Sequence, residues 1–249
     1  MAKKYFQEKD LHNLKDEIEH GKRISDKAEF IWGQATKAGK LRVERRSYLL
    51  TSLAEINTAE KTLELGCGTG EYTSRLSPSS KKIIAIDISL PLIQQAKQKL
   101  PDVNFIIADA ENLPFKEGIF EAVVGNAVLH HLNLDKALAE MKRVLKPGGK
   151  IAFTEPNMLN PQNLVVKNIK FIKKIVGESP DEQAFFRWQI SRILINKGFN
   201  DVVARPFDFL HPVTPTPLIS LVNIVGKLCE KMPIIKEIAG SLMIKGNKQ

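Results

Sequence analysis

The sequence predicts an α/β protein built on a mostly parallel sheet with helices on both faces, and two observations support this fold class. Between residues 61 and 155, short apolar runs of strand length alternate with stretches of helical periodicity. A helix between successive strands makes a βαβ unit, which places the two strands parallel. In addition, 249 residues with 43% hydrophobic side chains suffice for one large domain, or one domain with a lid.

The elements follow in order along the chain. Residues 8–30 and 41–56 have helical patterns, and Gly33 and Gly39 punctuate them. The predicted strands are the apolar runs 62–65, 82–86, 103–108, 122–125 and 150–153, with helical patterns at 71–77, 90–100 and 133–145. The turn residues Pro147, Gly148 and Gly149 are expected to separate the last helix from its strand.

The pattern loosens after Glu155. Glu155 and Asn157 follow the fifth predicted strand, where they could bind substrate or belong to a polar loop. We predict helices over 162–176 and about 182–197, a sixth strand at 202–204, a second helical insert over 218–238 and a closing strand at 241–245. The expected organisation is an N-terminal helical cap over residues 1–60 and a main domain over 61–249. The main domain would carry helical lid inserts at about 156–180 and 208–240.

The cysteines and the apolar segments indicate a compartment. The chain has only two cysteines, Cys67 and Cys229, and this count excludes a disulfide framework. The two lie far apart in the sequence and fit no metal-ligand spacing, so no metal is expected. A reducing cytosol is the expected setting. The N-terminus has no apolar run of a secretory signal, and the most apolar stretch, Leu218–Gly226, is far shorter than the roughly 20 residues of a membrane span. The prediction is a cytoplasmic protein, at most peripheral to the inner face of a membrane.

The positive charge is concentrated in the last third of the chain. The total is 37 − 28 = +9; residues 1–60 contribute 12 − 10 = +2, residues 61–155 contribute 12 − 11 = +1, and residues 156–249 contribute 13 − 7 = +6. The predicted helix at 162–176 is amphipathic: apolar side chains lie on one side and four lysines on the other, Lys167, Lys170, Lys173 and Lys174. It is interpreted as a lid over an apolar substrate, a contact with an anionic bilayer, or an ordinary cap helix. No basic patch interleaved with aromatic residues is present, so no nucleic-acid partner is expected.

The run from Leu63 to Gly70 is the most informative segment. An apolar strand ends at Gly66, and Gly66, Cys67, Gly68 and Gly70 make a tight turn whose backbone amides a ligand can approach. Asp87 ends the next strand, beside Ile88, at the place where an acid accepts hydrogen bonds from ribose hydroxyls. Asp109 and Ala110 follow the third strand and are expected to meet an adenine edge. The alternative is a plain turn with two helix N-caps.

The glycine spacing separates two kinds of nucleotide. A dinucleotide fold uses G-x-G-x-x-G, but here the run is G-x-G-x-G followed by Glu71, and no Gly-Lys-Ser/Thr of a P-loop follows. A ligand with adenosine but no pyrophosphate fits better. A nicotinamide-dependent Rossmann oxidoreductase remains an alternative, as does a non-catalytic, membrane-associated, cofactor-binding protein.

Five ordered motifs together resemble the class I S-adenosylmethionine-dependent methyltransferases. They are the glycine run 63–70, Asp87, Asp109-Ala110, the segment 120–132 with its Leu-His-His-Leu, and Arg143–Gly149. The likeness is to the small-molecule and lipid branch typified by ubiquinone-biosynthesis-type enzymes. It implies a Rossmann-like, doubly wound, seven-stranded sheet with an antiparallel last strand. It also implies that Glu64 and the glycine run hold the methionyl part of S-adenosyl-L-methionine, Asp87 the ribose, and Asp109-Ala110 the adenine, with Asn126 beside the cofactor.

Methyl transfer from a sulfonium is an in-line displacement that needs alignment and exclusion of water. His131 is the candidate general base or substrate-orienting group, because imidazole titrates near neutral pH; the alternative is that it only packs or caps. Arg42, Arg45 or Arg46 could pair with the cofactor carboxylate, or form a solvated face. The run after Asn126, Ala127-Val128, lacks the Pro-Pro-aromatic pattern of nucleic-acid amino-methyltransferases. The expected acceptor is small and apolar or lipid-like, and nothing indicates the oligomeric state.

Overall fold

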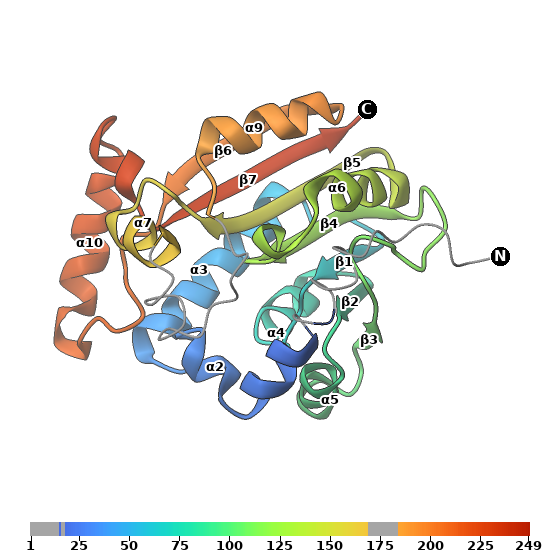
Figure 1. Cartoon of the computed structure of the whole chain (residues 1–249), viewed down its shortest axis with the longest axis horizontal. Coiled ribbons are helices and arrows are strands. Elements are labelled where there is room, and N and C mark those ends of the chain that lie inside the picture. The colour runs from blue at the N-terminus through green and yellow to red at the C-terminus, as the bar shows by residue number, and fades with distance from the viewer. Residues whose placement is uncertain (1–14, 16–17, 169–183) are drawn as a thin grey trace.

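The computed structural model describes residue 15, residues 18–168 and residues 184–249, and it contains one seven-stranded sheet (Figure 1). The strands are β1 (Thr62–Leu65), β2 (Ile83–Asp87), β3 (Asn104–Ile107), β4 (Phe120–Asn126), β5 (Leu145–Pro156), β6 (Phe199–Phe207) and β7 (Ser241–Lys248). Their order is β3-β2-β1-β4-β5-β7-β6. The strands β1 to β5 pair in parallel, and β7 is antiparallel to both β5 and β6. The predicted fold class and its antiparallel last strand are confirmed.

Helices cover both faces of this sheet, as a doubly wound fold requires. Among the described residues, the helices include α2 (Ala28–Ile31), α3 (Lys37–Leu53), α4 (Thr73–Leu76), α5 (Leu90–Lys99), α6 (Leu134–Val144), α7 (Pro161–Asn168), α9 (Arg187–Asn196) and α10 (Ile219–Cys229). Helices α6 and α9 bury apolar side chains against one face, together with Leu63 and Leu65 of β1. Helices α3, α4 and α5 pack on the other face. Because side chains alternate along a strand, Glu64 points to the α3 and α4 side.

Two sets of residues predicted as turns between elements lie inside elements of the structure. Pro147, Gly148 and Gly149 lie inside β5, where Leu145 pairs with Phe120 and Lys150 with Ala122, so the extra residues form a bulge instead of ending an element. Gly39 lies in the first turn of α3, because the helix begins earlier than predicted, at the N-cap Thr36.

The described residues cover only part of two predicted helices. The helix expected at 8–30 lies partly outside them, and the helix expected at 162–176 is described only as α7, up to Asn168. Lys170, Lys173 and Lys174 lie outside the described residues. Within the described part of the chain, no helix is both long and apolar enough to cross a membrane. The role of the C-terminal inserts as a lid stays a prediction.

The sheet direction brings six strand ends together. Strands β1 to β5 are parallel, and β6 runs the same way because both β5 and β6 are antiparallel to β7. Their last residues therefore meet at one edge, called here the carboxyl edge, where ligands bind in open α/β sheets. Figure 1 shows α7 and α10 gathered beyond this end of β5 and β6.

Candidate active site

The glycine run forms the turn that the sequence predicts at the end of β1. Gly66, Gly68 and Gly70 have φ of 64°, 53° and 82°, a region that residues with a Cβ atom rarely adopt. A Cβ atom on Gly66 would lie 2.7 Å from Cγ2 of Val128, and one on Gly68 would lie 2.9 Å from Cζ3 of Trp32. The turn therefore needs glycine both for its conformation and for the close approach of two neighbouring segments.

Asp87 is linked directly to this turn. Its Oδ2 accepts the N–H of Gly68 at 2.8 Å, and its Oδ1 accepts the N–H of Ser89 at 2.9 Å. Burial raises the pKa of Asp87, while the N–H groups of Ser89, Gly68 and Ile88 and the charge of His131 act in the opposite direction. The structure thus joins the end of β2 to the glycine run, as predicted, and places His131 near the same carboxylate.

Glu64 is buried beneath the turn. It is 2% exposed, and burial raises the pKa of its carboxyl to about 7, with the charge of Asp87 acting in the same direction and the nearby hydroxyl of Thr73 opposing it. Its Oε2 has no hydrogen-bond partner, although buried polar atoms nearly always have one. The hydroxyl of Thr73, which lies near Glu64, is also buried without a hydrogen-bond partner. The carboxyl of Glu64 can therefore take one more hydrogen bond, from a ligand group or an ordered water.

The residues that follow β3 make fewer polar contacts at the carboxyl edge than those at the ends of β1 and β2. Asp109 accepts the N–H of Glu111 at 2.8 Å, which is a local turn contact of the kind that the alternative reading gives it. Ala110 is buried in the core beside Leu113, and Ile88 is half-buried next to Asp87. These residues line the continuation of the same edge from β2 to β3.

The turn after β4 is fixed by a buried carboxylate at the end of β5. Glu155, at the end of β5, accepts the N–H groups of Val128 at 2.9 Å and Leu129 at 2.8 Å, and it pairs with Nδ1 of His130 at 2.6 Å. Its side chain is fully buried. His130 is therefore part of the support of this turn. The ring of His131 lies against His130, with centroids 4.2 Å apart.

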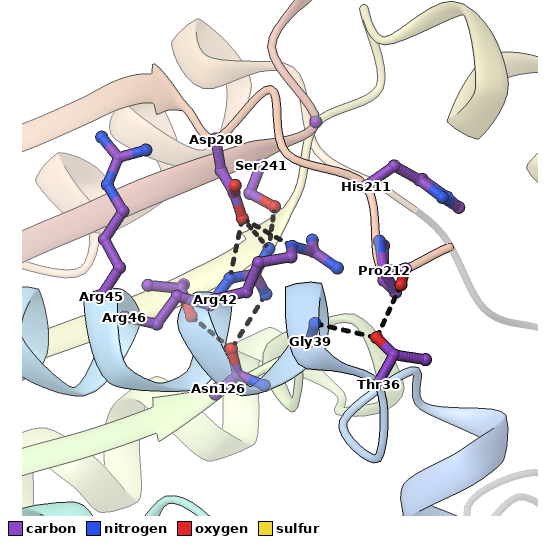
Figure 2. Close-up of polar contacts among 12 residues, drawn as sticks. Thr36, Gly39, Arg42, Arg45, Arg46, Asn126, Asp208, His211, Pro212 and Ser241 are labelled. Atoms are coloured by element: carbon purple, nitrogen blue, oxygen red, sulfur yellow. Dashed lines mark hydrogen bonds and ion pairs between the residues drawn. The ribbon is translucent and has the colours of Figure 1, made fainter. Parts of the chain in front are cut away.

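Asn126 ends β4 in a polar cluster that also holds the arginines of α3 (Figure 2). Its Oδ1 accepts from Thr154 Oγ1 at 2.5 Å and from Arg46 Nη1 at 3.2 Å. Arg46 also donates to Oδ2 of Asp208 at 2.8 Å and to Ser241 Oγ at 2.6 Å. The α3 helix is thereby anchored to the ends of β4 and β6.

The other two arginines extend this anchor. Arg42 donates from Nε to Oδ2 of Asp208 at 2.9 Å, and Arg45 forms a two-bond pair with Glu230, at 2.8 and 2.5 Å. Burial alone would raise the pKa of Asp208, but the charges of Arg46 and Arg42 outweigh it and lower the pKa. The Nη atoms of Arg42 donate to no residue in the described part of the chain. Arg45 and Arg46 are thus committed to carboxylates, whereas Arg42 keeps a free donor pair.

The N-terminal segment lies over the glycine run. Besides the contact of Trp32 with Gly68, Glu29 accepts the hydroxyl of Thr69 at 3.0 Å and pairs with Lys99. Glu29, Thr69 and Asp208 are not predicted as parts of the site from the sequence. No pattern of spacing marks them, because their partners are distant in sequence. Among the described residues, no cluster of His, Cys, Asp or Glu is suited to hold a metal ion.

Comparisons with known proteins agree with this geometry. Residues 63–153 match the model of a methyltransferase domain. The demethylmenaquinone methyltransferase of Paenarthrobacter aurescens is 33% identical over 184 residues, which cover 67% of this chain and 72% of that protein. The chain belongs to the S-adenosylmethionine-dependent methyltransferases. It is therefore an enzyme whose cofactor is S-adenosylmethionine, and a nicotinamide-dependent oxidoreductase is not favoured.

Two further likenesses carry less information about the acceptor. A tRNA (carboxymethyluridine(34)-5-O)-methyltransferase of Arabidopsis thaliana is 41% identical over 106 residues, which cover 41% of this chain and only 25% of that protein. A solved SAM-dependent methyltransferase from Archaeoglobus fulgidus has a TM-score of 0.63 at 18% identity, covering 88% of this chain and 99% of that one. The first likeness is partial, and the second shows the fold alone, so neither one indicates an acceptor for this methyltransferase.

Proposed function

We propose that this methyltransferase acts on a small acceptor that is apolar or lipid-like, bound at the carboxyl edge of the sheet. The observation that carries the proposal is the similarity to the demethylmenaquinone methyltransferase, which extends over 72% of that protein and so beyond the cofactor-binding segment. The acceptor in that protein's name is an apolar molecule. The arrangement of α10, whose apolar side chains are exposed beside the same edge, supports an acceptor of this kind.

The residues of the edge fit the cofactor group by group. We assign the backbone of Gly66, Cys67, Gly68 and Gly70, together with Glu64, to the methionyl part. The unpartnered Oε2 of Glu64 supports this assignment, because an ammonium group there would supply the missing hydrogen bond. The free Nη pair of Arg42 would take the cofactor carboxylate.

The adenosine half falls to the next two strand ends. We assign Asp87 to the ribose hydroxyls, with Ile88 beside it, and Asp109 and Ala110 to the adenine. Asn126 would close the other end of the site near the transferred methyl group. Asp87 retains acceptor capacity for this role, since a carboxylate has about four lone-pair sites and two backbone N–H groups occupy only part of them.

The bound cofactor supplies an electrophilic methyl group on a sulfonium with a good leaving group. The chain has to align the acceptor atom behind that methyl group and keep water out. His131 is the proposed proton acceptor for a hydroxyl or other protonated nucleophile. It is better placed for this than His130, because Glu155 already holds the Nδ1 of His130 in the support of the turn.

A methyl-transfer screen tests the acceptor class. Purified protein would be incubated with prenylated quinols, phenols, fatty acids and bulk tRNA, and formation of S-adenosylhomocysteine would be measured for each. Turnover with a quinol, phenol or lipid acid, abolished in Asp87→Ala, is the expected result. Turnover with tRNA alone would contradict the proposal.

An acceptor of this kind partitions into bilayers, so we also propose that the protein contacts a membrane surface peripherally.

A further inference from the structure

Helix α10 shows an uninterrupted apolar side to solvent. Seven aliphatic side chains there are between 47% and 85% exposed: Leu218, Leu221, Ile224, Val225, Leu228, Met232 and Ile234. We call this set the apolar α10 face. From Leu218 to Leu228 the members lie three or four residues apart, with Val225 next to Ile224, so they share one side of the helix. Met232 and Ile234 follow shortly after the helix ends at Cys229. Exposed apolar sets of this size mark interaction surfaces.

The opposite side of α10 is the one that packs on the protein. Ile219 and Gly226 are buried, and a Cβ atom on Gly226 would lie 3.0 Å from Cβ of Phe209, in the segment that leads from β6 to α10. Ile219 packs with Ala38 and Leu210. The helix is therefore seated through its small and apolar inner side, and the apolar α10 face is left over after that packing.

The charges around this face have one sign. Lys227 and Lys231 are exposed, Lys236 is half-buried, and none of the three is in an ion pair among the described residues. The two acids of the segment are each in an ion pair within the protein, Glu230 with Arg45 and Glu237 with Arg187. The surface that surrounds the apolar side chains is thus positive. A positive rim around an apolar helix face is the pattern of helices that lie in an anionic membrane interface.

The position of α10 connects this face to the candidate active site. The helix follows β6 at the carboxyl edge, and Glu230 at its end contacts Arg45 and the backbone N–H of Asp208. Arg46, one residue further along α3, contacts both Asp208 and Asn126. A membrane surface in contact with α10 would therefore lie at the same carboxyl edge of the sheet as the site where methyl transfer is proposed (Figure 1).

We propose that the apolar α10 face docks on the surface of an anionic bilayer, with its aliphatic side chains among the acyl chains and Lys227 and Lys231 at the lipid phosphates. This rests on the proposed function, since it brings the carboxyl edge to a lipid-like acceptor. A second copy of the chain is a poorer occupant, because a symmetric contact across this face would bring the lysines of both copies together.

Vesicle flotation tests the proposal with the full chain. The wild type is expected to float with vesicles of phosphatidylglycerol and phosphatidylcholine, but not with phosphatidylcholine alone. The double variant Ile224→Glu, Leu228→Glu is expected to weaken vesicle binding by about a hundredfold. Two apolar side chains that would be buried among the acyl chains are replaced by charged ones. Lys227→Glu with Lys231→Glu is expected to weaken binding by at least about tenfold, and more so at low salt.

Matched controls separate this surface from folding and from catalysis. Ile195→Glu on α9 changes an aliphatic side chain that is 59% exposed, against 62% for Ile224, and should leave flotation unchanged. Calorimetry with S-adenosylhomocysteine on every variant reports whether the cofactor site is intact. Wild type that binds the cofactor but no anionic vesicle overturns the docking surface and leaves the proposed acceptor class standing. Light scattering that shows a dimer, made monomeric by Ile224→Glu with Leu228→Glu and without vesicle binding, would reassign the face to a second copy.

Discussion

On the β2 side of the carboxyl edge, Asp87 is held by the backbone N–H groups of Gly68 and Ser89, whereas on the β6 side Asp208 is held by the side chains of Arg42 and Arg46. Both carboxylates lie at strand ends on the same edge. Two backbone N–H groups hold Asp87 locally and occupy only part of its acceptor sites, so its carboxylate keeps capacity for a ligand. Arginine donors cross-link segments that are far apart in the chain.

This difference assigns different tasks to the two sides. The β1 to β3 side retains unsatisfied polar capacity, in Glu64 and Asp87, and is the side where the cofactor is proposed to bind. On the β6 side the arginines are mostly paired, and the pairs attach α10 to α3. One side is thus shaped to receive a ligand, and the other to hold the insert that is proposed to meet the acceptor.

The largest expected effect lies on the β6 side and concerns stability. Asp208→Ala removes the shared partner of Arg42 and Arg46 and leaves two buried guanidinium groups without their carboxylate, which should cost about 3–5 kcal/mol of unfolding free energy. Guanidinium chloride denaturation followed by circular dichroism measures this. Asp102→Ala, at an exposed turn, is the control and should change stability by less than about 0.5 kcal/mol. Equal stability of the two variants would show that the arginine cluster is not a structural anchor.

The next effect is on cofactor affinity and belongs to the β2 side. Asp87→Ala should weaken binding of S-adenosylhomocysteine by about a hundredfold, since two hydrogen bonds from ribose hydroxyls to a carboxylate are lost. Isothermal titration calorimetry gives the value. Asp87→Asn keeps one carbonyl acceptor for Gly68 and should lose less. A dissociation constant unchanged in both variants would remove Asp87 from the cofactor site.

The two sides also differ in how far the sequence predicted them. The glycine turn and Asp87 were predictable because the evidence is local: a strand, a positive-φ turn and an acid at the next strand end. The pairing of Arg42 with Asp208 joins residues 166 positions apart, and no periodicity connects them. Glu155 was seen at a strand end, but its three hydrogen bonds to the turn after β4 depend on how β4 and β5 pack side by side. Long-range side-chain pairing is set by tertiary packing, so a single sequence does not reveal it.

The third effect concerns the chemical step, and it distinguishes the two adjacent histidines. His131→Gln should lower kcat by about a hundredfold with an acceptor that must lose a proton, because general base catalysis is typically worth that much or more. Its pH–rate profile should also lose the limb near neutral pH. His130→Gln should act mainly through the stability of the turn, because its partner is Glu155. A change of only a few-fold in kcat for His131→Gln, with an unchanged profile, would leave His131 as a packing residue.

The smallest effect is a pH dependence that originates at Glu64. Burial raises the pKa of this carboxyl to about 7 in the folded protein, from 4.5 as the ordinary value. The folded state therefore holds a proton that the unfolded state releases in this window, and stability from this group falls as pH rises toward and through 7. Between about pH 6 and pH 8 the loss should be about 1 kcal/mol. Glu64→Gln has no such ionisation, so its unfolding free energy should fall less over the same range. Denaturant midpoints of both proteins at the two pH values provide the comparison.

Saturating S-adenosylhomocysteine should flatten the wild-type dependence, because an ammonium group beside Glu64 favours the ionised carboxylate. Parallel curves for wild type and Glu64→Gln would show that Glu64 is already ionised in the folded protein, and that its carboxylate is satisfied without the cofactor.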